Sequence, residues 1–159
     1  MTFTLTTLAR SIADYLEPVM PGVTMYEDPN QQGTETPAMF LQQRYGSIKK
    51  QLDGYYLRTL GLDLTYLEDY NLTDLQQKYQ RAGEALDLVM ETFPYTDPYT
   101  DEKSDSTEVI RAFDRSWTID LDALHYKFEV RVRVTPEEAA VLMKRADLTI
   151  EVKEAEQNG

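Results

Sequence analysis

The sequence contains no cysteine and a single histidine among its 159 residues. The absence of cysteine excludes a disulfide framework and thiolate metal sites, and it fits a reducing compartment. With one imidazole and no thiol, a zinc site would need almost wholly carboxylate ligands, which zinc does not favour. We therefore predict neither a zinc centre nor a bound cofactor.

Long apolar runs and basic charge are also scarce. The apolar runs extend over only a few residues and no signal peptide is visible, so no segment is expected to enter a membrane. The sequence contains 28 Asp and Glu residues but only 16 Lys and Arg residues, so its net charge is −12. Because phosphate binding depends on basic patches that release counterions, this charge disfavours DNA binding as the main task. The simplest interpretation of the acidic charge is that it keeps the protein soluble.

The composition that remains is that of a globular protein, with 42% hydrophobic and 28% charged residues. The length suits one domain of ordinary size. We predict a single domain over residues 1–153, followed by a disordered tail over 154–159.

Helical periodicity predicts two main helices. The first covers residues 3–17, with Thr4 as its N-cap. The second covers residues 72–93, where Thr73 and Gln76 have the spacing of a capping box. A short third helix is expected to begin at Thr135 and to end near Ala146.

Alternating apolar residues predict the strands. The segments are 23–28, 37–45, 54–67, 108–119, 124–134 and 148–152. In the fourth segment, the side chains predicted to point inward are Val109, Phe113, Trp117 and Ile119. Since helices and strands do not alternate regularly, we predict an α+β fold, with a mostly antiparallel sheet of four to six strands and two main helices packed on one face.

The strand "HYKFEVRVRV" (125–134) alternates most regularly and leaves a charged row on its outer side. Glu129, Arg131 and Arg133 belong to this row. In so acidic a chain, the arginines could pair with acidic groups on a neighbouring copy, so we predict that these three residues lie at a subunit or partner interface.

Two tyrosines occur in the polar segment 94–106, which reads as an exposed loop. Exposed tyrosines suit protein contacts because they bring a large area at low entropy cost. We predict Tyr95 and Tyr99 at the same interface. The alternative is a loop that folds down on its own aromatic side chains.

No arrangement of residues indicates a particular catalytic chemistry. His125 lies beside a turn and the sequence has no G-x-S-x-G motif, so a surface histidine is the simpler interpretation. Asp120 and Asp122 could hold Mg²⁺, although turns favour the same residues. Glu151, with Asp147 before it, gives a weak nuclease-like pattern. We predict that the protein is not an enzyme, with a metal-dependent hydrolase kept as an alternative.

Three segments carry a resemblance to a known family. They are "GTETPAMFLQQ" (33–43), "YYLRTLGLDLTYL" (55–67) and "LHYKFEVRVRV" (124–134). In this order, after a first helix, the chain resembles the small tail-terminator or tail-completion proteins of long-tailed bacteriophages. The resemblance covers about residues 1 to 134.

The resemblance implies a structural component of the virion tail that is made in the host cytoplasm during assembly. Such subunits form a ring, typically a hexamer, which caps the tail tube and joins it to the head connector. The expected partners are further copies of the chain, the tail tube protein and the head–tail connector protein. DNA would pass through the lumen without specific binding, which an acidic wall favours. The alternative from a different class is a monomeric protein-binding module or inhibitor that uses its loops and sheet face.

Overall fold

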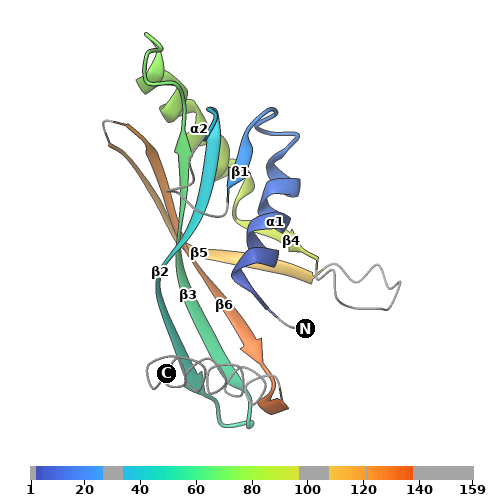
Figure 1. Cartoon of the computed structure of the whole chain (residues 1–159). Coiled ribbons are helices and arrows are strands. Elements are labelled where there is room, and N and C mark those ends of the chain that lie inside the picture. The colour runs from blue at the N-terminus through green and yellow to red at the C-terminus, as the bar shows by residue number, and fades with distance from the viewer. Residues whose placement is uncertain (1–2, 27–33, 97–107, 121, 138–159) are drawn as a thin grey trace, which may run out of the picture. The chain divides into compact units, whose positions relative to one another are not determined.

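The computed structural model describes residues 3–26, 34–96, 108–120 and 122–137 (Figure 1). The elements in these residues are α1 (Leu5–Leu16), β1 (Thr24–Tyr26), β2 (Ala38–Lys50), β3 (Tyr56–Leu67), α2 (Leu75–Val89), β4 (Thr92–Tyr95), β5 (Glu108–Ile119) and β6 (Leu124–Val134). The strands form one sheet in the order β1-β2-β3-β6-β5-β4. β1 is parallel to β2, whereas β5 is antiparallel to both β4 and β6. The predicted α+β class with a mostly antiparallel sheet is confirmed.

The chain divides into two compact units. The first comprises residues 1–46 and 59–131, and the second comprises residues 47–58 and 132–159. Both helices and the whole of β1, β4 and β5 belong to the first unit, while β2, β3 and β6 contribute residues to both.

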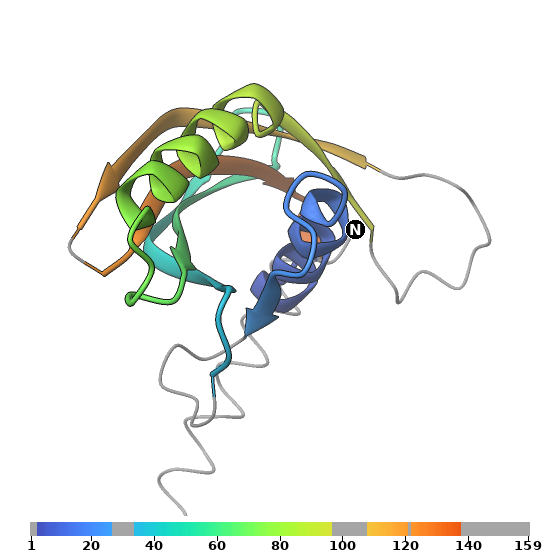
Figure 2. The same ribbon diagram turned by 90° about the horizontal axis from the view of Figure 1, so that it is seen from above.

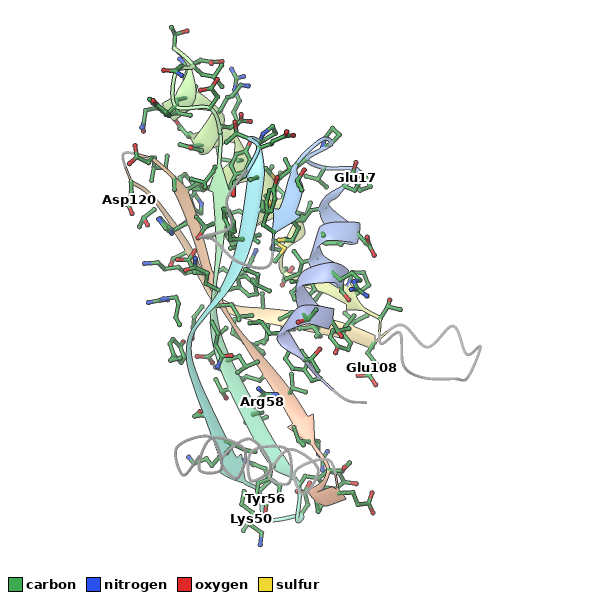
Figure 3. The ribbon with its side chains drawn as sticks, viewed as in Figure 1. Glu17, Lys50, Tyr56, Arg58, Glu108 and Asp120 are labelled. Carbon is green, nitrogen blue, oxygen red and sulfur yellow. The ribbon has the colours of Figure 1, made fainter. Side chains whose placement is uncertain are left out.

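In the second unit, a tight turn joins β2 to β3. The strand predicted over 37–45 is longer in the structure, where β2 continues to Lys50 (Figure 3). The N–H of Gln51 donates to the carbonyl of Tyr55 at 2.7 Å. Gly54 has φ 85°, a conformation that only glycine adopts without strain. The turn is therefore closed by its own backbone, which lets the strand run further than predicted.

The first helix forms as its sequence predicts. The Oγ1 of Thr4 accepts a hydrogen bond from the N–H of Thr7 at 3.2 Å, which confirms the N-cap. Leu8, Ile12 and Leu16 are buried along one face of α1. In Figures 1 and 2, α1 lies beside β1 and β4, where this face contributes to the core.

The second helix is shorter than predicted. α2 starts at Leu75 after Asp74, which makes no side-chain capping bond, so the predicted capping box is wrong. The helix ends at Val89, and the predicted last turn contains strand β4 instead. The spacing of Phe93 fits both a helix and a strand. Pro94 has no backbone N–H and so cannot donate the hydrogen bond that continues a helix. Pairing with β5 buries Phe93 and ends the helix early.

Strand β5 contains an irregularity that reverses the predicted inward face of its first half. Ile110 and Ala112 are buried, whereas Val109 is 71% exposed, so the predicted inward Val109 is wrong. The pairing with β6 shifts between Phe113 and Ser116, and Asp114 has φ 51° there. An extra residue in one strand changes which side chains face the core. Phe113, Trp117 and Ile119 are half-buried.

Strand β6 follows its predicted alternation and supplies the centre of the core. Its buried side chains are Leu124, Tyr126, Phe128, Val130, Val132 and Val134. The Tyr126 hydroxyl donates to Asp87 Oδ1 of α2 at 3.0 Å, and the Tyr15 hydroxyl of α1 donates to the Val89 carbonyl at 2.7 Å. The prediction that two helices lie on one face of the sheet is confirmed.

The buried tyrosines make stability sensitive to alkaline pH. Burial, followed by the hydrogen bond to Asp87, raises the pKa of Tyr126 from 10.0 to about 12. Burial also raises the pKa of Tyr66 and of Tyr79. Above the ordinary tyrosine pKa, the unfolded chain loses phenolic protons that the folded chain keeps, so stability falls as pH rises from about 10 to 12. Urea unfolding across this range is expected to show a steeper decline for the wild type than for Tyr126→Phe.

Candidate subunit interface

Glu129 of the predicted charged row lies at the centre of a hydrogen-bonded group. One carboxylate oxygen, Oε2, accepts from the Tyr45 hydroxyl at 2.9 Å. The other, Oε1, accepts from Arg131 Nε at 2.9 Å. The hydrogen bond to Glu129 raises the pKa of Tyr45. Glu129 is therefore held by internal partners, and its side chain is only 14% exposed.

Arg131 is fixed on its other side by an aromatic ring. Its guanidinium carbon lies 4.1 Å from the ring centroid of Phe113 on β5, and its side chain remains 41% exposed. Cation–π contacts of this kind contribute about 0.5–1 kcal/mol at exposed sites. We call Tyr45, Phe113, Glu129 and Arg131 the cross-strand cluster, because it connects β2, β6 and β5.

Gly61 makes the cross-strand cluster possible. It lies on β3, between β2 and β6 in the sheet. A Cβ at this position would lie 2.1 Å from a ring carbon of Tyr45. The missing side chain lets the Tyr45 ring cross β3 and reach Glu129. A glycine inside an alternating strand often marks such a close approach, and this signal is visible in the sequence.

Arg133 makes separate contacts within the second unit. Its guanidinium pairs with Asp53 and lies 4.1 Å from the ring centroid of Tyr55. The side chain is 60% exposed. The row predicted from the sequence thus contains residues with different local partners, and the structure does not bring Arg133 into the cross-strand cluster.

Tyr95 differs from the prediction, whereas Tyr99 lies outside the described residues. Tyr95 belongs to β4 and is 1% exposed, so the prediction of an exposed loop position is wrong. Its ring stacks on Phe3 at 5.2 Å, and its hydroxyl accepts from the N–H of Thr4 at 3.3 Å. Pairing of β4 with β5 turns this side chain into the core, so it offers no surface to a partner.

His125 is enclosed by carboxylates and is not the simple surface residue that we predicted. Its Nδ1 lies 3.0 Å from Asp63 Oδ2, and its Nε2 lies 3.1 Å from Asp120 Oδ2. Asp120 is at the end of β5 (Figure 3), while Asp63 comes from β3 and also accepts from the Thr65 hydroxyl at 3.1 Å. With a carboxylate at each ring nitrogen, the imidazole has no free position from which to activate a nucleophile.

The suggested metal ligands do not come together in the described part of the chain. Asp120 contacts His125, and the backbone carbonyl of Asp122 accepts from the Tyr79 hydroxyl at 2.9 Å. Residues 3–26, 34–96, 108–120 and 122–137 contain no group of three His, Cys, Asp or Glu side chains placed to hold a metal ion. Asp147 and Glu151 lie outside these residues, as do the predicted strand 148–152 and most of the predicted third helix.

An open groove of about 340 Å³ lies elsewhere in the first unit. Apolar side chains that follow α1, including Met20 and Val23, line one part of it. Lys78 and Arg81 of α2 line another part. Glu68 lines the groove as well, so apolar side chains lie beside charges of both signs. Such a lining suits a charged segment of a protein partner better than a small uncharged molecule.

These observations define an α+β protein with a six-stranded sheet and two helices among the described residues. A family model described as phage tail terminator protein matches residues 7–141, and the chain belongs to this family. The predicted resemblance is thereby confirmed, and it extends beyond Val134. No curated protein matches the chain. The protein is thus a structural component of the phage tail that acts with other tail and head–tail components. Within the described segments, no helix has the length and apolar character needed to traverse a lipid bilayer.

Proposed function

We propose that copies of this protein form a ring, typically of six subunits, that caps the finished tail tube and joins it to the head connector. The ring would stop tube polymerisation without chemical catalysis. The observation that carries this proposal is the family membership, which covers residues 7–141. The partners are further copies of the chain, the tail tube protein and the connector protein, and the protein assembles in the host cytoplasm.

The cross-strand cluster supports a role in contacts between proteins. Arg131 is held between Glu129 and Phe113 and is still partly exposed. A side chain that is already ordered loses less conformational entropy when a partner binds. Arg131, together with Arg133 of the second unit, would meet acidic groups of a neighbouring subunit and fix its orientation.

The net charge of −12 suits the passage of DNA through such a ring. A basic lumen would retain the phosphate backbone, because each neutralised phosphate releases counterions and strengthens binding. An acidic lumen repels it. The proposed ring would therefore guide the genome without binding it specifically.

The test is to add purified protein to growing tail tubes that lack a terminator. We expect the tubes to stop growing and electron microscopy to show added density at one end. Arg131→Glu with Arg133→Glu should weaken capping by about tenfold or more. Each exposed ion pair contributes about 0–1 kcal/mol, so this double variant should still fold. Arg10→Glu, on the exposed side of α1, is the matched control and should cap normally.

Two results would contradict different parts of the proposal. Tubes that keep elongating with saturating wild-type protein would exclude the capping function. Normal capping by the folded double variant would remove the two arginines from the contact and leave the function in place. Circular dichroism of each variant identifies any loss of folding.

The groove favours a monomeric binding module as a second candidate. Lys78→Glu with Arg81→Glu would then weaken binding of a partner that contacts these two cations, while tube capping would be absent from the wild type as well. The capping experiment therefore separates the two functions directly.

A further inference from the structure

The two long outer strands of the sheet are only partly covered by their short neighbours. β1 pairs with β2 at Ala38–Phe40, and β4 pairs with β5 at Glu108–Arg111. Among the described residues, Leu41–Gly46 of β2 and Phe113–Ile119 of β5 therefore have a strand neighbour on one side only. We call these two segments the β2 edge and the β5 edge. Both lie in the first unit.

The backbone of the β2 edge is oriented for pairing. The N–H of Thr24 donates to the carbonyl of Pro37 at 3.2 Å, so position 37 directs its backbone groups outward. Alternate residues of a strand direct these groups to the same side. Leu41 and Gln43, which directly follow the paired residues, therefore present their N–H and C=O groups at the β2 edge.

The β2 edge lacks one device that usually prevents pairing. Residues 38–50 contain no proline. By contrast, β4 carries Pro94, and β5 has its irregularity at Asp114. After this irregularity, the β5 edge continues regularly from Ser116 to Ile119.

The two edges also differ in charge. The β2 edge contains Arg44 and no acid. The β5 edge contains exposed Asp114 and is followed by Asp120, which contacts His125 and whose side chain is 71% exposed. The intervening Arg115 donates to the backbone carbonyl of Asp87 at 2.8 Å and is thereby turned toward α2. Two β2 edges would place like charges opposite each other, whereas a β2 edge beside a β5 edge would place opposite charges together.

We infer that the β2 edge of one copy pairs with the β5 edge of the next, at Leu41–Gly46 and Ser116–Ile119. This inference rests on the proposed ring and names the contact that builds it. Two different surfaces of the same chain then meet, which is the arrangement that closes a ring of identical subunits. Backbone hydrogen bonds supply the affinity, as in other cases of strand addition, and the flanking charges favour the correct partner.

Crosslinking tests the arrangement directly, because the chain has no cysteine of its own. Gln43→Cys and Thr118→Cys are prepared as separate variants, mixed with tail tubes and treated with a flexible bismaleimide. We expect crosslinked dimers from the mixture and none from either variant alone. The double variant should give a ladder of larger species. Dimers from Gln43→Cys alone would show symmetric pairing and overturn the inference, as would the absence of any product from the mixture.

Proline substitution tests whether the backbone N–H is used. Gln43→Pro removes one outward N–H and should leave the fold intact, because proline is tolerated where an edge N–H faces solvent. Gln43→Thr is the matched control, since it keeps the N–H. We expect the proline variant to associate with other copies about tenfold more weakly than the control.

Capping experiments separate this inference from the proposed function. If wild-type protein caps tubes and folded Gln43→Pro associates as well as the control, the β2 edge is not the contact and the function stands. If the wild type fails to cap tubes, the proposed function fails whatever the crosslinks show. If the Gln43→Pro variant does not fold, the crosslinking of mixed Gln43→Cys and Thr118→Cys variants decides whether the two edges pair.

Discussion

Replacing Phe128 by alanine is expected to lower the free energy of unfolding by about 3–5 kcal/mol. The side chain is 3% exposed at the centre of β6. Its ring packs edge to face on the ring of Phe93, with 6.2 Å between the two ring centroids. The centroid of the Tyr126 ring lies 6.3 Å away. The truncation removes both aromatic contacts and leaves a cavity that the surrounding sheet and helices can fill only partly. Guanidinium unfolding at neutral pH measures the loss.

Phe113→Ala provides the matched control for this prediction. Phe113 is a half-buried ring on the neighbouring strand, where it lies under the guanidinium of Arg131. Its truncation removes less buried area and one cation–π contact, so we expect a loss of about 1–2 kcal/mol. Equal losses from the two variants would show that β6 does not supply the centre of the core.

Regular alternation explains why β6 was predictable. Its buried and exposed residues follow one period from Leu124 to Val134, and no irregularity interrupts them. In β5 the same reasoning failed for Val109, because the register shift near Asp114 reverses the inward face. The alternation of apolar residues shows the strand but does not show where an extra residue enters it.

β4 was missed because its residues satisfy two patterns. Phe93 continues the helical spacing of α2, and it also alternates with Tyr95 as in a strand. Tertiary pairing with β5 decided between them. The same pairing explains the error at Tyr95, since the polar residues that follow it suggested a loop, while its partner strand lies further along the sequence.

The candidate interface could be predicted only in part. The charged row was visible because Glu129 and Arg131 alternate with buried residues on one strand. Tyr45 comes from β2, which is distant in sequence, and its approach depends on the sheet order β2-β3-β6-β5. Phe113 comes from β5, the strand directly before β6, and its position opposite Glu129 depends on the register of that pair. Gly61 offered a local signal of a close approach, but it did not identify the ring that fills the space.

Replacing His125 by alanine is expected to lower the free energy of unfolding by about 2–3 kcal/mol. The Asp63 side chain is 11% exposed and loses the imidazole nitrogen 3.0 Å from its Oδ2. The Thr65 hydroxyl still donates to Asp63 Oδ1 at 3.1 Å. The Asp63 carboxylate therefore keeps one hydrogen-bonding partner instead of two. A carboxylate that is mostly removed from water and has lost a hydrogen-bonding partner is destabilising. Urea unfolding near neutral pH measures the loss.

Two further variants identify the cause. Asp120→Asn changes the other carboxylate beside His125, but that side chain is 71% exposed, so we expect a loss of at most about 0.5–1 kcal/mol. Adding Asp63→Asn to His125→Ala removes the uncompensated charge and should restore part of the lost stability, because contacting residues are coupled. The loss from His125→Ala should also persist in high salt, since buried pairs are screened less than exposed ones. If the second substitution adds its own full cost and restores nothing, Asp63 and His125 are not coupled, and the stabilising role of this pair is wrong.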